Sequence, residues 1–268
     1  MNNEESGVRG IEFVDVPYLI LTRSRSGSNL FKDYLNSHPK VKSYGEVFGS
    51  IKNKNIENII EEVYSAENNP QASGFKFFYY HPNGEPHRSD VARSIWAHLK
   101  AIPGLKVINL IRNPLRCIVS ASIMKQIRDS NLEVNHVKMK HGENRPDINE
   151  RRVILNPEDT LRMLKSIESL KQELLEYFGP EVCMVRYSEL CKNPNQTMNE
   201  VFAHLGIEDV EVSSRLQKQN PEYQQDIQYR GLHQLSGLER APPRKQTGYW
   251  QLQQQLSTPT VQHYWQNT

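Results

Sequence analysis

The sequence is short of cysteine and of long apolar runs. Its three cysteines, Cys117, Cys183 and Cys191, are odd in number and widely spaced, which argues against a disulfide framework and against a zinc site. No stretch approaches the roughly 18–20 apolar residues of a membrane span. The opening stretch MNNEESGVRG lacks the basic-then-apolar order of a signal peptide. We therefore expect a soluble, cytoplasmic protein without a membrane span.

The chain also lacks an excess of charge of either sign. It has 33 lysine and arginine residues against 31 aspartate and glutamate residues, so its formal net charge at pH 7 is +2. A general nucleic-acid coat needs a basic excess, and nucleic acid is therefore not expected as a partner. Any binding of anions must come from local clusters of arginine and lysine.

What the chain does have is a regular alternation of two kinds of segment. Hydrophobic residues make up 37% of its 268 residues, enough for a buried core. Short apolar runs typical of buried strands are PYLILTR from Pro17, GFKFFYY from Gly74, KVINLIR from Lys106 and EVCMVRY from Glu181. Amphipathic segments predict helices over residues 28–37, 56–66, 90–100, 114–128, 157–178 and 194–205. This order predicts an α/β fold with a central, mostly parallel sheet flanked by helices, in one domain over residues 1–268.

Two segments depart from this alternation. Residues 129–155 are polar and too long for an ordinary connection, and we interpret them as a lid or binding loop, with surface filler as the alternative. Residues 209–268 are rich in glutamine but hold aromatic residues that could pack a last, closing segment onto the domain. Disorder of part of this tail is the alternative.

The first predicted strand ends in arginines, serines and a glycine. The stretch TRSRSGSN, residues 22–29, lies where the carboxyl end of a parallel strand would bind a ligand. With Gly27 removing steric conflict, backbone N–H groups at the next helix start would point at an anion, which the helix dipole also favours. Ser26 and Ser28 add hydroxyl donors, and Arg25 adds a guanidinium that stays charged. The stretch predicts a phosphate or sulfate site, with a simple turn capped by Ser28 or Asn29 as the alternative.

A second strand end repeats this pattern. Arg112 follows the strand KVINLI, and Ser120 lies eight residues later in the next predicted helix. At about 3.6 residues per turn the two positions fall on nearly the same face and could hold one phosphate. The alternative makes Arg112 a surface charge and Ser120 a small residue at a helix–sheet contact. The loop lacks the Gly-Lys-Ser ending of a nucleoside-triphosphate site, and Arg112 stands where a magnesium carboxylate would be needed, so no metal is expected.

At these residues the sequence resembles the sulfotransferases that use 3′-phosphoadenosine 5′-phosphosulfate (PAPS), especially the bacterial and carbohydrate-directed branches. In that family an Arg-Ser-Gly-Ser/Thr stretch holds the 5′-phosphosulfate and is matched here by RSGSN, residues 25–29. A later arginine and serine hold the 3′-phosphate and are matched by Arg112 and Ser120. The stretches SHPKVKSYGEVF, VRYSEL and NPNQTMNEVFAHLGI continue the likeness in the family's order. The resemblance implies a P-loop-like sulfotransferase fold with a nucleotide-binding core over about residues 17–207.

The resemblance also implies the reaction. The enzyme would transfer a sulfuryl group from PAPS by in-line displacement to a hydroxyl of a sugar, glycolipid or small polar metabolite. The product would be 3′-phosphoadenosine 5′-phosphate (PAP), and the partner a small-molecule or glycan acceptor. Two alternatives stay open: a nucleotide-dependent phosphotransferase, which would need the missing magnesium carboxylate, and a catalytically silent nucleotide-binding protein.

Single residues receive roles from the same resemblance. Arg25 aligns with the cation that stabilises charge on the bridging oxygen of the leaving phosphate, and Ser120 could also reach the phosphosulfate. Glu46 aligns with the carboxylate base of many carbohydrate sulfotransferases, with capping or pairing to an arginine of the loop as the alternative. His81 is the rival base, because the sulfotransferases of phenols and steroids use a histidine after a strand. Lys76 could face the sulfuryl group or its acceptor, although lysines at strand edges are usually solvated.

Further residues complete the predicted nucleotide site. Arg23 and Ser24 open the first loop, and a structural salt bridge is the alternative for Arg23. Tyr187, in the stretch RYSEL, lies where the family places a residue near the adenine, or it is a core strand residue. Arg244 and Lys245 could supply the charges of a late loop that closes over the 3′-phosphate, although the family's Gly-x-x-Gly-x-x-Lys spacing is absent.

Overall fold

The computed structural model describes residues 14–49, 55–66, 70–82, 89–129, 155–214 and 216. These residues fall into two compact units. Unit 1 contains the described residues up to 23 together with those in 28–110 and 170–214. Unit 2 contains residues 24–27, the described residues in 111–169, and residue 216.

Unit 1 is built on a five-stranded sheet with the strand order β2-β3-β1-β4-β5. The strands are β1 (Val16–Thr22), β2 (Val41–Tyr44), β3 (Ala72–Phe78), β4 (Lys106–Ile111) and β5 (Val182–Arg186). β1 pairs in parallel with β3 and β4, and β3 pairs in parallel with β2. The carboxyl ends of these four strands therefore lie at the same end of the sheet, where open α/β sheets bind ligands.

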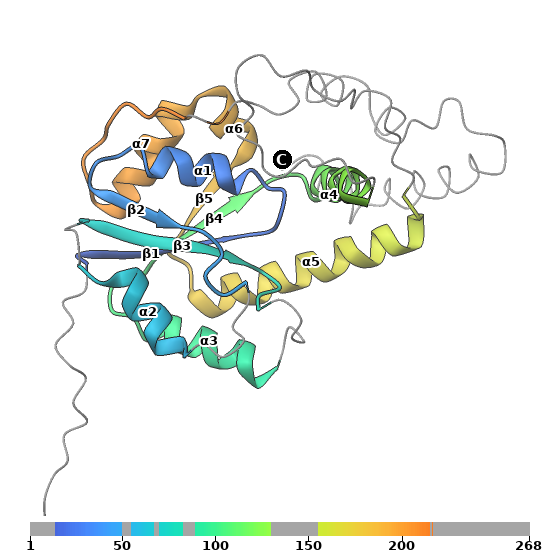
Figure 1. The fold of residues 1–268 in the computed structure, drawn as a ribbon, viewed down its shortest axis with the longest axis horizontal. Coiled ribbons are helices and arrows are strands. Elements are labelled where there is room, and N and C mark those ends of the chain that lie inside the picture. The colour runs from blue at the N-terminus through green and yellow to red at the C-terminus, as the bar shows by residue number, and fades with distance from the viewer. Residues whose placement is uncertain are drawn as a thin grey trace, which may run out of the picture. The chain divides into compact units, whose positions relative to one another are not determined.

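Helices cover both faces of this sheet. One face carries α1 (Ser28–Leu35), α6 (Tyr187–Lys192) and α7 (Pro194–Leu205), and the other carries α2 (Ile56–Tyr64) and α3 (Asp90–Lys100) (Figure 1). Unit 2 contains α4 (Pro114–Asp129), and α5 (Pro157–Phe178) begins in unit 2 and ends in unit 1. None of the helices in the described ranges combines the length and apolar character that a membrane crossing requires.

The alternation of side chains along β1 explains the two-sided core. Tyr18 and Ile20 pack with Phe31 of α1 and Phe202 of α7 in one hydrophobic cluster. Leu19, also fully buried, points to the opposite face because successive strand residues alternate. A strand that is apolar on both faces must lie inside the sheet, as β1 does.

Gly74 allows β1 and β3 to approach closely. It pairs with Tyr18 in the parallel register. A Cβ atom at position 74 would lie 2.2 Å from the Tyr18 carbonyl oxygen and 2.3 Å from the nearest atom of its ring. The Tyr18 hydroxyl donates to the backbone oxygen of Lys42 in β2 at 3.2 Å. The missing side chain thus lets an aromatic ring from β1 pass over β3 and reach β2.

Polar side chains mark where several helices begin. Asn55 and Ser89 accept hydrogen bonds from backbone N–H groups in the first turns of α2 and α3. Asn113 does the same for α4, accepting from the N–H groups of Leu115 and Arg116 at 3.0 and 3.2 Å. These caps satisfy N–H groups that have no partner inside the helix. The cap at Asn113 fixes the start of α4 directly after Arg112.

The structure confirms the predicted α/β fold with a parallel sheet flanked by helices. Helices α3, α5 and α7 have the predicted ends, α1 and α2 end two residues early, and α4 ends one residue late. β2 and α6 were not predicted, because segments of 4 and 6 residues show too little periodicity. The predicted lid over 129–155 and the closing segment over 209–268 lie almost entirely outside the described residues.

Candidate functional site

The loop between β1 and α1 contains two residues with a left-handed backbone. Arg25 has φ 65° and Gly27 has φ 93°. Glycine adopts such values freely, whereas other residues do so rarely. In turns of this kind, successive backbone N–H groups point into one concave site that can bind an anion. A loop with this backbone is suited to an anion, so a phosphate or sulfate site here stays a prediction.

Within unit 2, Arg112 and Ser120, the two residues of the second strand-end motif, both contact Arg25. Nη1 of Arg112 donates to the Arg25 carbonyl oxygen at 2.9 Å, and Sγ of Cys117 lies 3.5 Å from the same oxygen. Nε of Arg25 donates to Oγ of Ser120 at 3.1 Å. The structure thus brings together two motifs that are more than 80 residues apart in the sequence. Arg112 thus contacts the main chain of Arg25, and Ser120 contacts its side chain.

The other residues of the first motif differ in burial. Arg23, Ser26 and Ser28 are buried, and Ser24 is half-buried. Asn29 is exposed in the first turn of α1.

Unit 1 holds a separate polar cluster around Lys76 in β3. Only 4% of the Lys76 side chain is exposed. Its Nζ donates to Oδ1 of Asn29 at 2.7 Å and to Oε1 of Glu46 at 3.4 Å. Burial lowers the pKa of Lys76, Glu46 acts in the opposite direction, and the nearby Lys32 lowers it further. The alternative of a solvated lysine at a strand edge does not apply, because β3 lies inside the sheet between β1 and β2.

Glu46 lies in the turn that follows β2. Its side chain is 39% exposed, so it is open to solvent while one of its oxygens contacts Lys76. Among the described residues, the ion-pair partner of Glu46 is this lysine. The role of Glu46 as a base stays a prediction.

His81 is buried after the end of β3. Its Nδ1 accepts a hydrogen bond from the backbone N–H of Phe78 at 3.1 Å, so the hydrogen of the neutral ring is on Nε2. Burial, and then the charge of Lys76, lowers the pKa of His81 to about 4. The ring packs against those of Phe77 and Phe78 at centroid distances of 5.5 and 4.8 Å. A base needs an unprotonated nitrogen facing its substrate, and here that nitrogen is engaged by the main chain.

Replacing His81 with asparagine should make the free energy of unfolding less sensitive to acid. The folded protein keeps His81 neutral down to pH about 4, whereas the unfolded chain takes up the proton near the ordinary value of 6.5. The folded state therefore loses stability as the pH falls from 6.5 toward 4. The His81→Asn variant keeps an acceptor for the Phe78 N–H. Between about pH 7.5 and 4.5, the free energy of unfolding of the wild-type protein should fall by about 2–3 kcal/mol more than that of this variant. Urea unfolding at both pH values measures this difference, and equal losses in the two proteins would contradict it.

Tyr187 is the first residue of α6, directly after β5. It is half-buried and lies at the carboxyl end of a strand, so it is not the core strand residue of the alternative reading. Arg244 and Lys245 lie outside the described residues. No group of three or more histidine, cysteine, aspartate or glutamate side chains that could hold a metal ion occurs in the described ranges.

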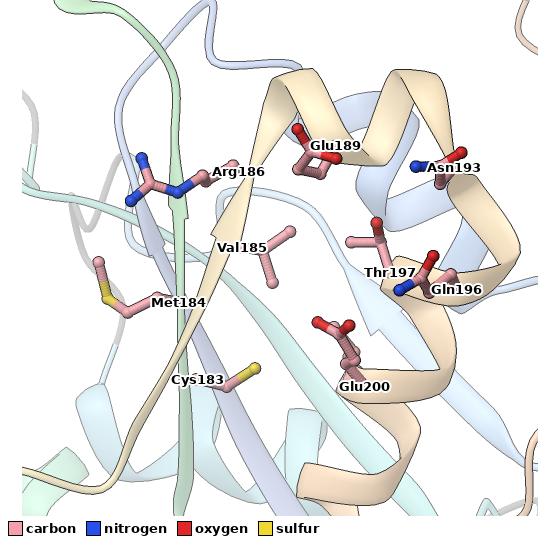
Figure 2. A pocket seen from close by; sticks show the side chains of 10 residues that line it. Cys183, Met184, Val185, Arg186, Glu189, Asn193, Gln196, Thr197 and Glu200 are labelled. Atoms are coloured by element: carbon pink, nitrogen blue, oxygen red, sulfur yellow. The ribbon is translucent and has the colours of Figure 1, made fainter. Parts of the chain in front are cut away.

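A pocket of about 260 Å³ lies beside β5 (Figure 2). Along the strand, Cys183 and Val185 project to one side and Met184 and Arg186 to the other. Helices α6 and α7 complete the lining with Glu189, Asn193, Gln196, Thr197, Glu200 and Val201. Burial, and then the charge of Glu200, raises the pKa of the Cys183 thiol, which disfavours the reactive thiolate. None of the predicted site residues lines this pocket.

The model of the sulfotransferase family matches residues 17–211. The chain belongs to the sulfotransferase family. The match includes both strand-end motifs of this sulfotransferase, together with Glu46, Lys76, His81 and Tyr187. Arg244 and Lys245 lie beyond it.

Solved structures similar to this sulfotransferase include two sulfotransferases and a sulfotransferase domain. A sulfotransferase from Alicyclobacillus acidocaldarius shares 16% identity over 81% of this chain and 90% of that chain, with a TM-score of 0.47. Mouse sulfotransferase SULT7A1, complexed with PAP, shares 11% identity over 96% and 91% of the two chains, with a TM-score of 0.47. The sulfotransferase domain from the curacin biosynthetic pathway shares 16% identity over 74% and 76%, with a TM-score of 0.44. No curated protein sequence matches this sulfotransferase.

Proposed function

We propose that this sulfotransferase moves the sulfuryl group of PAPS to a hydroxyl of a sugar, glycolipid or small polar metabolite, as in the bacterial and carbohydrate-directed branches of the family. One observation carries the proposal. Arg25 is contacted by both Arg112 and Ser120, so residues of both phosphate motifs gather at one place. A nucleotide with a phosphate group on each side of its ribose is the kind of anion that two such motifs can bind together.

Each motif has its own role in the proposal. Residues 24–29 hold the 5′-phosphosulfate through backbone N–H groups and serine hydroxyls, and Arg25 stabilises the negative charge that develops on the leaving oxygen. Arg112 and Ser120 hold the 3′-phosphate. The bound nucleotide supplies the activated sulfuryl group, and the chain supplies binding, orientation and charge stabilisation. Further contacts to the nucleotide are assigned to Arg23, Tyr187, Arg244 and Lys245.

Glu46 is the proposed base for the acceptor hydroxyl. Its partial exposure supports this role, since an acceptor must reach the carboxylate, and Lys76 contacts only one of its two oxygens. His81 is the second candidate. Its engaged Nδ1 leaves an N–H group at Nε2, and a neutral ring in that form offers a donor where a base is required.

Titration with PAP in the presence of a metal chelator tests the donor. Isothermal titration calorimetry should detect PAP binding without magnesium, because arginine and serine contacts need no metal bridge. A protein that binds ATP only with magnesium, and PAP not at all, would favour the phosphotransferase alternative.

Turnover separates the enzyme from a silent nucleotide-binding protein. Conversion of PAPS to PAP is followed by ion-exchange chromatography with glucose, N-acetylglucosamine, glycerol or phenol as acceptor, and with water alone. We expect at least one hydroxyl compound to accelerate PAP release over the water control. PAP binding without any accelerated release would favour the silent protein.

Replacing Arg112 with alanine should weaken PAP binding by about 1.5–3 kcal/mol, which is about 10- to 150-fold in Kd, because a charge-assisted phosphate contact is lost. Calorimetry with PAP and with AMP, which lacks the 3′-phosphate, locates the effect: the loss for AMP should be less than about threefold. Arg162→Ala is the matched control, since it removes the same charge from an exposed site in unit 2. Equal losses for PAP and AMP would contradict a direct contact with the 3′-phosphate.

A further inference from the structure

We propose that Lys76 is a positioning residue whose buried ammonium group orients the carboxylate of Glu46 and ties it to the start of α1. The inference rests on the proposed function, in which Glu46 accepts the proton of the acceptor hydroxyl. It adds a residue that acts on the reaction through Glu46 and does not itself touch the transferred group.

Lys76 contacts the Glu46 segment through both its main chain and its side chain. Its backbone N–H donates to the carbonyl oxygen of Gly45 at 3.0 Å. Its Nζ reaches Oε1 of Glu46 at 3.4 Å and Oδ1 of Asn29, in the first turn of α1, at 2.7 Å. One residue of β3 thus connects the turn that carries the proposed base with the helix that follows the anion loop in the sequence.

The main chain around Glu46 is fixed from the other side as well. The N–H of Gly49 donates to the Glu46 carbonyl oxygen at 3.0 Å, closing a turn. Phe48 is fully buried, and its ring lies 5.4 and 6.1 Å from those of Phe75 and Phe77. With the backbone held, the side-chain torsions of Glu46 are its main remaining freedom. The contact with Lys76 restricts them and leaves the second carboxylate oxygen for an acceptor.

The charge of Lys76 matters as much as its position. Three titratable groups face it from three elements: Glu46 after β2, Lys32 on α1 and His81 after β3. Of these, Glu46 is the anion that offsets the burial of the ammonium group. The ion pair with Lys76 therefore adds an electrostatic restraint on the Glu46 carboxylate to the geometric one.

The test compares Lys76→Met with Lys32→Met, which removes the same charge from α1 but breaks no contact with Glu46. The rate is that of PAP release from PAPS, with the most effective acceptor of the panel or with water if none is effective. Lys76→Met should lower kcat by about 10- to 100-fold. Its affinity for PAP should stay within about threefold of that of the wild-type protein. Lys32→Met should not alter kcat by more than about twofold.

A double-mutant cycle with Glu46→Gln separates positioning from direct contact. If Lys76 acts through Glu46, adding Lys76→Met to Glu46→Gln lowers kcat by less than about threefold further. An equal loss in both backgrounds would overturn the proposal, because Lys76 would then act on the transferred group itself.

Three further outcomes are decisive. If circular dichroism shows that Lys76→Met is unfolded, Lys76→Gln, which keeps an N–H donor without the charge, must show the same dependence on Glu46 in the double-mutant cycle. Normal PAP binding with an unchanged rate in the variant would defeat the role of Lys76 and leave the proposed function standing. Failure of the unchanged protein to bind PAP would defeat both.

Discussion

Arg25→Ala should lower kcat for PAP release by about 100- to 1,000-fold, the largest effect expected of any single residue in the first loop. The reason is electrostatic. In-line displacement builds negative charge on the oxygen that bridges sulfur and phosphorus, and a preorganised guanidinium stabilises this charge more than that of the ground state. The affinity for PAP should fall by less than about tenfold, because Arg112, Ser120 and the backbone N–H groups remain. Initial rates at saturating PAPS, with calorimetry of PAP binding, measure the two effects separately.

Arg25→Gly is the control for backbone strain. Arg25 has a left-handed backbone, so alanine at this position is strained whereas glycine is not. If the loss comes from the missing cation, the glycine and alanine variants should be equally slow. Recovery of most of the rate by glycine would contradict the electrostatic role and assign the effect to the shape of the loop.

Glu46→Gln should reduce kcat by about 100- to 10,000-fold while PAP binding stays unchanged, because the amide keeps the shape of the side chain but cannot accept the proton. The measurement uses saturating PAPS and the most effective acceptor. Glu62→Gln, which neutralises an exposed carboxylate of α2, is the control and should retain full activity. A near-normal rate for Glu46→Gln would reject Glu46 as base and make the rate of His81→Asn the next measurement.

Much of the fold could be predicted because its core strands are apolar on both faces. The apolar runs that begin at Pro17, Gly74 and Lys106 form β1, β3 and β4. The capped, amphipathic segments between the strands form helices with nearly the predicted ends. The sequence did not reveal the strand order, because the pairing of parallel strands depends on contacts between distant segments. The short strand β2 could not be predicted for the same reason. The extended conformation of VKSY depends on its pairing with β3 and not on its own composition.

The candidate site was predictable in its parts but not in its contacts. The spacing of Arg112 and Ser120 pointed to one shared anion, and the structure adds that both residues bind Arg25. The burial of Lys76 could not be deduced, because a lysine in an apolar run is compatible with an edge strand until the strand order is known. Its contacts with Asn29 and Glu46 join three segments whose proximity only the fold defines.

The left-handed backbone of Arg25 sets stability and activity against each other at a single position. An arginine held at φ 65° carries strain of about 1 kcal/mol or more that a glycine would not. Selection for stability alone would therefore favour glycine at position 25, while selection for turnover would favour arginine. A library randomised at this codon and sorted separately for thermal stability and for PAP release should return different residues from the two sorts.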